Sequence, residues 1–215
     1  MYGIFNDNFP PILDGVALTA QNYAYWLNEK GYDVRVITPY APKSEAVLNA
    51  AGYPINRYIS VPIPFRHPYR YGMPYIDLPF MRNWRKMQFE LVHAHCPFTT
   101  GDLALSASRK QQIPLVATFH SKYRQDFEHN VKSKIVVDWM VRHIIRFFEQ
   151  ADEVWIPQAA VEPTLREYGF KGHVEVVENG NDFYTPSPQI AAMRKEMREE
   201  LGLEPDETMR HHLAP

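Results

Sequence analysis

Short apolar runs recur along the chain, and most are followed by a stretch whose apolar side chains return every three or four positions. Runs such as DVRVIT and PLVATF have the length and β-branched content of buried strands. Ala17–Lys30 instead shows helical spacing and ends before Gly31, a residue type that commonly terminates helices. The pattern predicts strands alternating with helices. The expected strands are Tyr2–Phe5, Asp33–Thr38, Tyr58–Val61, Phe89–Ala94, Pro114–Phe119, Glu153–Ile156 and Val174–Val177.

This alternation predicts an α/β fold, a Rossmann-like, doubly wound, mostly parallel sheet of about seven strands covered by helices on both faces. Parallel strands need long crossover connections, and the helical stretches supply them. The apolar positions from Trp139 to Phe148 are expected to face the core. The remaining expected helices are Ser44–Ala51, Thr100–Lys110, two within 122–150, one over 158–168, and a polar amphipathic segment over 188–201.

Composition narrows the class of protein further. The formal net charge is -2, which gives no basic field for nucleic acid. Cys96 is the single cysteine, so an internal disulfide is excluded and a reducing compartment is favoured. No apolar run approaches the roughly 18 residues of a membrane span, and no basic segment precedes an apolar run at the N-terminus. We therefore expect a cytoplasmic protein, located at the inner face of the membrane if it binds lipid.

Polar residues follow the predicted strands, where open α/β sheets bind ligands. Gly15 stands at the start of a predicted helix, whose free N–H groups favour an anion, although a glycine there also serves simply to turn the chain. The loop lacks the GxGxxG fingerprint of dinucleotide sites. His93 and His95 share one side of a strand without a third ligand nearby, so we expect no metal. His120 directly follows PLVATF and is placed to hydrogen-bond a substrate hydroxyl or support developing charge.

Five ordered motifs carry a resemblance to a known family. They are 7-DNFPPILDGVA-17, 91-LVHAHCPFTTG-101, 115-LVATFHSKY-123, 151-ADEVWIPQAAVEPTLREYG-169 and 174-VEVVENGND-182. Together they resemble the N-terminal domain of the GT-B glycosyltransferases of family 4, the retaining group, over residues 1 to 205. The sequence departs from the family pattern at Glu90, Gln158, Glu178 and Asn181, where aspartate, serine, proline and an aliphatic residue are usual.

The resemblance implies transfer of a sugar from a nucleotide-sugar donor with retention of configuration, without a required metal or a covalently bound cofactor. It places the donor over the glycine loop, because only a residue without a side chain lets the donor approach that backbone. His120 is the implied catalytic residue beside the transferred sugar. The implied donor-binding residues are Asp14, Gly15, Val16, Asn179 and Gly180.

The resemblance also predicts the domain organisation. Residues 1–185 correspond to the acceptor-binding domain, and 186–215 to a linker and helix leading to a donor-binding domain that the sequence does not include. We expect the exposed cleft face to favour self-association. The alternative is a stand-alone, non-catalytic module that binds a sugar, a lipid or a partner protein.

The acceptor side is expected to include residues 62–89, where basic and aromatic residues interleave between prolines. This composition suits an anionic membrane interface, although a solvated, proline-stiffened loop followed by an ordinary helix has the same composition. Single-stranded nucleic acid is disfavoured because the basic patch is short and local. The candidate acceptor-binding residues are Arg66, Arg70, His95, Thr99, Lys122, Tyr123 and Arg124.

Overall fold

The computed structural model describes residues 1–64, 66–120, 123–180, 192 and 195–199. The chain divides into two compact units, Met1–Asn179 and Gly180–Pro215. In the second unit, 195–199 are helical and Lys195 pairs with Glu199 at 3.8 Å. Most of the predicted amphipathic segment 188–201 lies outside the described residues.

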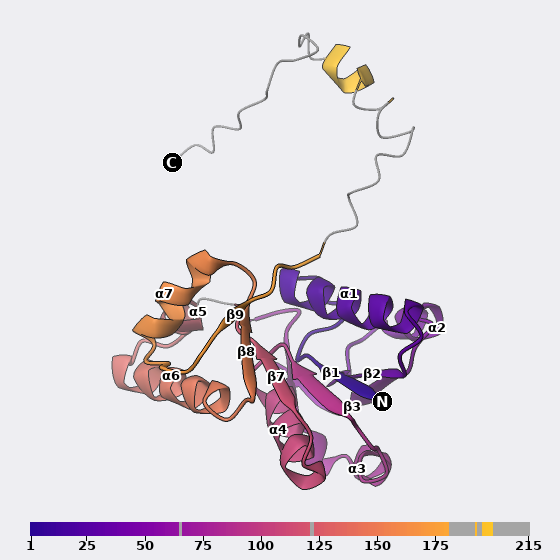
Figure 1. Cartoon of the computed structure of the whole chain (residues 1–215), viewed down its shortest axis with the longest axis horizontal. Coiled ribbons are helices and arrows are strands. Elements are labelled where there is room, and N and C mark those ends of the chain that lie inside the picture. Colours follow the sequence, from indigo (N-terminus) through magenta and orange to yellow (C-terminus); the bar gives the residue numbers. More distant parts are fainter. Residues whose placement is uncertain (65, 121–122, 181–191, 193–194, 200–215) are drawn as a thin grey trace. The chain divides into compact units, whose positions relative to one another are not determined.

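The first unit is built on a seven-stranded sheet in the order β3-β2-β1-β6-β7-β8-β9 (Figure 1). Every neighbouring pair in it is parallel, so the predicted Rossmann-like α/β class is confirmed. The order reverses between β1 and β6, which are adjacent in the sheet. The strands are β1 Tyr2–Phe5, β2 Val34–Pro39, β3 Ile55–Tyr58, β6 Leu91–Ala94, β7 Leu115–Thr118, β8 Glu153–Ile156 and β9 Glu175–Val176.

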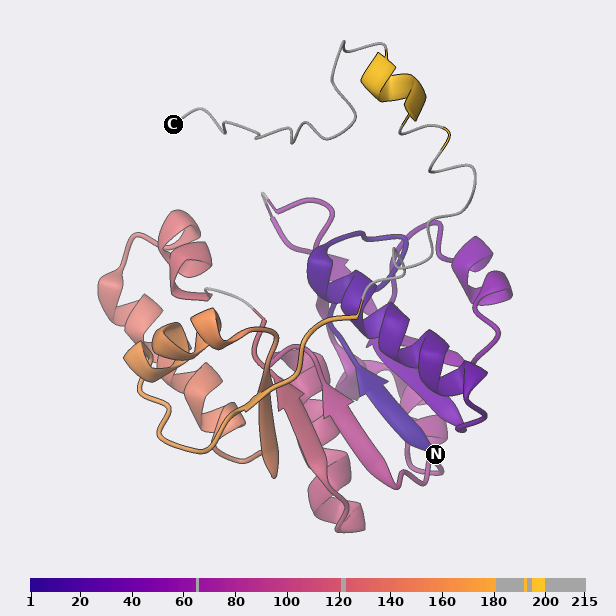
Figure 2. The ribbon, with the colours of Figure 1, turned by 45° about the horizontal axis from the view of Figure 1, so that its top comes forward.

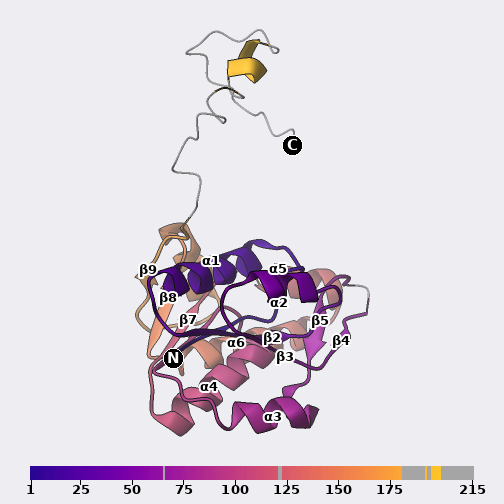
Figure 3. The ribbon, with the colours of Figure 1, turned by 90° about the vertical axis from the view of Figure 1, so that its right-hand side faces the viewer.

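Helices cover both faces of this sheet. Figures 2 and 3 show α1 on one face and α4 on the opposite one. The α-helices are α1 Gly15–Glu29, α2 Glu45–Ala50, α3 Leu78–Trp84, α4 Thr99–Gln111, α5 Tyr123–Asn130, α6 Lys134–Phe148 and α7 Glu162–Glu167. Two short 3-10 helices, η1 Pro74–Ile76 and η2 Ala159–Val161, precede α3 and α7.

Each face of the sheet has its own apolar core because successive strand residues point to opposite sides. In β1, Ile4 packs with Ala20 and Ala24 of α1 in the smaller cluster. Phe5 points the other way, into a large cluster with residues of α3, α4, α6 and α7. His93 has the same strand parity as Ile4 in the register of β1 and β6, so it lies on the α1 side.

The predicted third strand was misplaced. Tyr58–Val61 spans the end of β3 and the start of β4 (Ser60–Pro62). β4 leaves the main sheet and pairs antiparallel with β5 (Arg70–Gly72), forming a separate two-stranded hairpin. Ser44 precedes α2 as predicted, but its side chain makes no capping hydrogen bond. Its hydroxyl is buried without a partner.

One prediction about an aromatic side chain was wrong. Trp139 was expected in the core but is 60% exposed, and it stacks on His143 at the surface of α6. Phe80 and Trp84 of the 62–89 segment are 5% and 6% exposed and pack in the large core. α3 therefore uses its aromatic rings to attach the segment to the domain.

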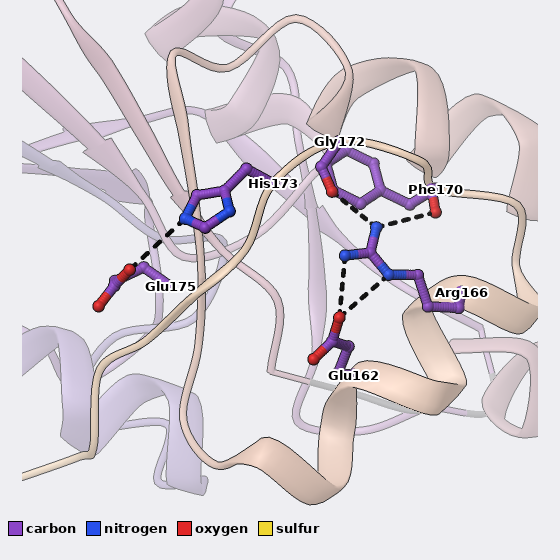
Figure 4. A network of polar contacts seen from close by, with 6 residues as sticks. All are labelled: Glu162, Arg166, Phe170, Gly172, His173 and Glu175. Atoms are coloured by element: carbon purple, nitrogen blue, oxygen red, sulfur yellow. Dashed lines mark hydrogen bonds and ion pairs between the residues drawn. The ribbon is translucent and has the colours of Figure 1, made fainter.

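A polar network fixes the connection from α7 to β9 (Figure 4). Arg166 donates to the Glu162 carboxylate at 2.9 Å and to the backbone carbonyls of Phe170 and Gly172 at 3.2 and 2.6 Å. One guanidinium thus closes the turn that returns the chain to the sheet edge.

Candidate functional site

The site lies at the reversal of strand order, where the loops after β1 and β6 meet. The backbone N–H of His95 donates to the carbonyl of Phe5 at 2.8 Å, continuing the strand pairing past the end of β6. The thiol of Cys96 donates to Asn6 at 2.9 Å. Burial raises the pKa of this thiol well above its usual value, so Cys96 is a structural hydrogen-bond donor.

Asp7 joins the first loop to the start of α4. Its carboxylate accepts hydrogen bonds from the Thr99 hydroxyl at 2.7 Å and from the Thr100 hydroxyl at 2.9 Å. Tyr58 lies within hydrogen-bond distance of Thr99, at 3.0 Å. Burial raises the pKa of Asp7, while the bonds from the two threonines oppose that shift. Thr99, a predicted acceptor-binding residue, is thus occupied in holding the site together.

A chain of hydrogen bonds fixes the glycine loop. Asn8 donates to one oxygen of Asp14 at 3.0 Å, and the N–H of Ala17 donates to the other at 2.7 Å. Asp14 is therefore the N-cap of α1, and both of its carboxylate oxygens are engaged within the loop. Arg57 donates to the carbonyl of Pro10 at 2.6 Å. Burial lowers the pKa of Arg57 to about 10.

Gly15 is the first residue of α1 and is exposed. A methyl group added to it would meet no atom of the domain within 4 Å, and its φ lies outside the left-handed region. The fold itself therefore gives no steric reason for glycine here. The space above the start of α1 is open, and Val16 beside it is half-buried.

A histidine cluster follows β6 and β7 on the α1 side. His93 Nε2 lies 2.7 Å from the Thr118 hydroxyl, and His95 Nδ1 lies 3.0 Å from His120 Nε2. Tyr23 of α1 packs against the His93 and His95 rings at centroid distances of 5.1 and 5.3 Å. Burial lowers the pKa of His120 to about 4 and that of His93 to about 3, and it takes the pKa of His95 well below its usual value. All three imidazoles are therefore neutral near pH 7.

Three predicted acceptor-binding residues are buried or paired within the domain. His95 is 0% exposed and lies behind His120, and Tyr123 is 6% exposed within the large core. Arg124 pairs with Asp138 at 2.7 Å across α5 and α6. Lys122 lies outside the described residues.

Two other predicted residues, Arg66 and Arg70, lie on the β4–β5 hairpin. Burial raises the pKa of Tyr69, and the carboxylate of Asp14 adds to this shift. Arg66 lies over the Tyr69 ring, at 5.6 Å from its centroid. Arg70 instead spans the hairpin, donating to the hydroxyl and carbonyl of Ser60 at 2.7 and 2.8 Å.

The end of the first unit carries the last predicted donor-binding residues. Asn179 and Gly180 are exposed and follow β9, but the boundary between the two units falls between them. Among the described residues, no group of three or more histidine, cysteine, aspartate or glutamate side chains is placed to hold a metal ion. The expectation of no required metal stays a prediction.

Sequence reasoning missed several residues that build the site. Asp7 begins the first of the five motifs but was not selected, although a carboxylate two residues after a predicted strand was a usable signal. Tyr23 and Arg57 act over long sequence distances, and no local pattern marks them.

Comparisons with known proteins agree with this geometry. The family model described as Glycosyltransferase Family 4 matches residues 13–183. Alpha-monoglucosyldiacylglycerol synthase of Streptococcus pneumoniae is 25% identical over 95% of this chain and 46% of its own length. The synthase of the same name from Acholeplasma laidlawii is 30% identical over 60% of this chain and 31% of its own length. The chain thus spans less than half of either relative.

Solved structures show the same fold. Anabaena Alr3699/HepE, crystallised with UDP and glucose, superposes with a TM-score of 0.62 at 17% identity, covering 94% of this chain and 50% of that one. The fold of this chain is that of the N-terminal domain of a GT-B glycosyltransferase. The family match covers most of the sequence, and the chain belongs to glycosyltransferase family 4.

Proposed function

We propose that this chain is the acceptor-binding half of a retaining glycosyltransferase that moves a sugar from a nucleotide-sugar donor to a lipid acceptor. The observation that carries the proposal is the open space over Gly15 at the reversal of the sheet, where the fold supplies no reason for glycine. The carboxylate of Asp14 takes only the N–H of Ala17 in the first turn of α1, so the remaining N–H groups and the positive dipole end are available to an anionic donor. The UDP and glucose in the structure of Anabaena HepE support a nucleotide-sugar ligand.

His120 acts on the transferred sugar in this proposal. Its imidazole is neutral, since burial lowers its pKa to about 4, so it makes hydrogen bonds without adding charge. A neutral ring suits contact with a sugar hydroxyl near the reacting carbon. Negative charge develops on the leaving diphosphate. As the family resemblance implies, helix dipoles and basic groups of a second domain stabilise this charge.

A lipid acceptor is supported by the names of the two curated relatives, both of which are alpha-monoglucosyldiacylglycerol synthases. The structure adds an exposed surface of matching chemistry on the 62–89 segment. Tyr71, Tyr75, Ile76 and Leu78 are 56–66% exposed. Arg82, Arg85 and Lys86 lie exposed on and just after α3. Exposed apolar groups beside cations are typical of an anionic membrane interface.

α6 exposes a second surface of this kind. Ile135 and Trp139 are 79% and 60% exposed. Lys134, Arg142 and Arg146 on the same helix are exposed beside them. No helix in the described part of the chain is both long and apolar enough to cross a membrane. Contact with lipid would then be at the surface of the bilayer.

Vesicle flotation tests the lipid part of the proposal. The chain should float with vesicles that contain anionic lipid and diacylglycerol, and binding should weaken in high salt because surface charge attraction is screened. Replacing Ile76 and Leu78 by serine should reduce flotation. Trp26, an exposed tryptophan on α1, supplies a matched control as Trp26→Ser. Equal flotation of the chain with neutral and anionic vesicles would contradict the proposed interface.

The transfer step is tested in the complete gene product. Incubation with UDP-glucose and diacylglycerol should give a glycolipid whose anomeric configuration, read from the proton coupling at the anomeric carbon, matches that of the donor. An inverted product would overturn retention while leaving sugar transfer in place. Vesicle binding without any transfer would favour the non-catalytic module.

A further inference from the structure

The ring of His120 is held by a single polar partner. Its Nε2 lies 3.0 Å from Nδ1 of His95, and the two rings stack at a centroid distance of 5.3 Å with 20° between their planes. Nδ1 of His120 has no hydrogen-bond partner among the described residues, and it does not appear among their buried unpartnered atoms. That nitrogen is therefore accessible to a ligand.

His95 is enclosed on every side. It is 0% exposed, with the His93 ring 4.1 Å away and the Tyr23 ring 5.3 Å away. The groups packed around it are the phenol of Tyr23 from α1, the imidazole of His93 from β6 and the imidazole of His120 after β7. No carboxylate or guanidinium hydrogen-bonds to this cluster in the described residues. Nε2 of His95 is buried without a partner.

Two arrangements of the shared proton are available to a neutral pair. In one, His120 donates from Nε2, and His95 must then carry its own proton on Nε2, leaving a buried N–H without an acceptor. In the other, His95 donates from Nδ1, and its Nε2 holds only a lone pair. Orphaned buried N–H groups are the rarer case in folded proteins, so the second arrangement is favoured.

We propose that His95 is a positioning residue that donates from Nδ1 to Nε2 of His120 and so fixes the proton of His120 on its accessible Nδ1. His120 then presents a hydrogen-bond donor at the site, and the ligand atom that it meets is an acceptor, such as a hydroxyl or phosphate oxygen. The assignment of a sugar hydroxyl rests on the proposed function. The proton arrangement itself does not.

Histidine side chains labelled with 15N test the arrangement in the intact chain at pH 7. A long-range proton–nitrogen correlation spectrum distinguishes a protonated ring nitrogen from a bare one. The expected result is a protonated Nδ1 and a bare Nε2 in both His95 and His120. Protonation of His120 on Nε2 would overturn the proposal, and the wild-type spectrum alone decides this.

Two variants test positioning. In His95→Asn the amide nitrogen takes the place of Nδ1 and still donates to His120, so the His120 signals should keep the wild-type pattern. In His95→Phe the donor is lost, and His120 should show a mixture of both tautomers. A His120 spectrum unchanged in His95→Phe would contradict a positioning role. An unfolded His95→Phe leaves the wild-type and His95→Asn spectra to decide.

Activity of the complete gene product separates this inference from the proposed function. His95→Phe should lower kcat about tenfold or more with little change in KM, and His95→Asn should recover most of it. A wild-type spectrum with the expected tautomers but no sugar transfer would sink the proposed function and leave the histidine arrangement standing. Sugar transfer together with a proton on Nε2 of His120 would overturn the histidine arrangement and leave the proposed function standing.

Discussion

The carboxylate of Asp7 accepts a hydrogen bond from the backbone N–H of Thr100 at 3.2 Å, although the two residues are 93 positions apart. Thr100 lies in the first turn of α4, where N–H groups lack partners within the helix. The N-cap position of α4 is Phe98, whose side chain has no acceptor. Asp7, from the loop after β1, therefore caps the N-terminus of α4 in place of a local N-cap side chain.

Replacing Asp7 by alanine should destabilise the domain by about 2–4 kcal/mol, because the cap of α4 is lost and the Thr99 and Thr100 hydroxyls lose their acceptor. Urea unfolding followed by circular dichroism measures the effect. Asp33, an exposed aspartate before β2, supplies the control, and Asp33→Ala should change stability by less than about 0.5 kcal/mol. Similar losses in the two variants would contradict the capping role.

The sheet was predictable because its strands are short apolar runs whose pattern is local. β1 and β8 lie over the residues predicted, and Gly31 has the positive φ expected of a helix terminator. The β4–β5 hairpin was not predictable, since β4 is two residues from β3 and only its pairing separates them. Pairing is a long-range property that spacing does not encode.

The candidate site was predictable in position but less so in detail. The strand ends indicated that His95 and His120 lie close together, and the structure places their ring nitrogens 3.0 Å apart, since carboxyl ends of parallel strands share one edge. Periodicity did not show which of the two histidines is buried. It also misjudged Trp139, because apolar spacing on α6 continues past the width of the face that the sheet covers.

Two glycines near the site should respond in opposite ways to alanine. In Gly101→Ala the new methyl would lie 2.6 Å from the carbonyl oxygen of Cys96 and 3.1 Å from the Phe147 ring, so a loss of about 1–3 kcal/mol is expected. In Gly15→Ala the new methyl has no neighbour within 4 Å. The free energy of unfolding should therefore stay unchanged or rise by up to about 1 kcal/mol.

The same Gly15→Ala variant should weaken binding of the nucleotide sugar in the complete gene product, because the methyl group enters the open space over α1. Isothermal titration with UDP-glucose measures this. Unchanged affinity with unchanged stability would mean that the donor does not approach Gly15.

Substitutions at a buried and at an exposed tryptophan should also differ clearly in their effect on stability. Trp84 is 6% exposed and packs against Phe5, Phe80 and Phe89, so Trp84→Ala should cost about 3–5 kcal/mol. Trp139→Ser at the exposed face of α6 should change stability by about 0.5 kcal/mol or less, but it should reduce flotation with anionic vesicles. A large loss of stability in Trp139→Ser would mean that its exposure is misassigned.

The buried histidines should make the domain sensitive to mild acid. His120 has a folded-state pKa lowered from 6.5 to about 4, so below pH 6.5 the unfolded chain takes up a proton that the folded chain does not. Stability should therefore fall as the pH drops from about 6.5 toward 4, by up to about 1.4 kcal/mol per pH unit for each such histidine. Asp7 acts in the opposite direction, because its folded-state pKa is raised.

The contribution of His120 is isolated by comparing pH profiles of unfolding for the wild type and His120→Gln. Glutamine does not titrate, so the variant should lose one histidine's share of the slope between pH 4 and 6.5 and match the wild-type slope above pH 7. His129, an exposed histidine on α5, supplies the control, and His129→Gln should keep the wild-type profile. A His120→Gln profile parallel to the wild type throughout would show that folding does not lower the pKa of His120.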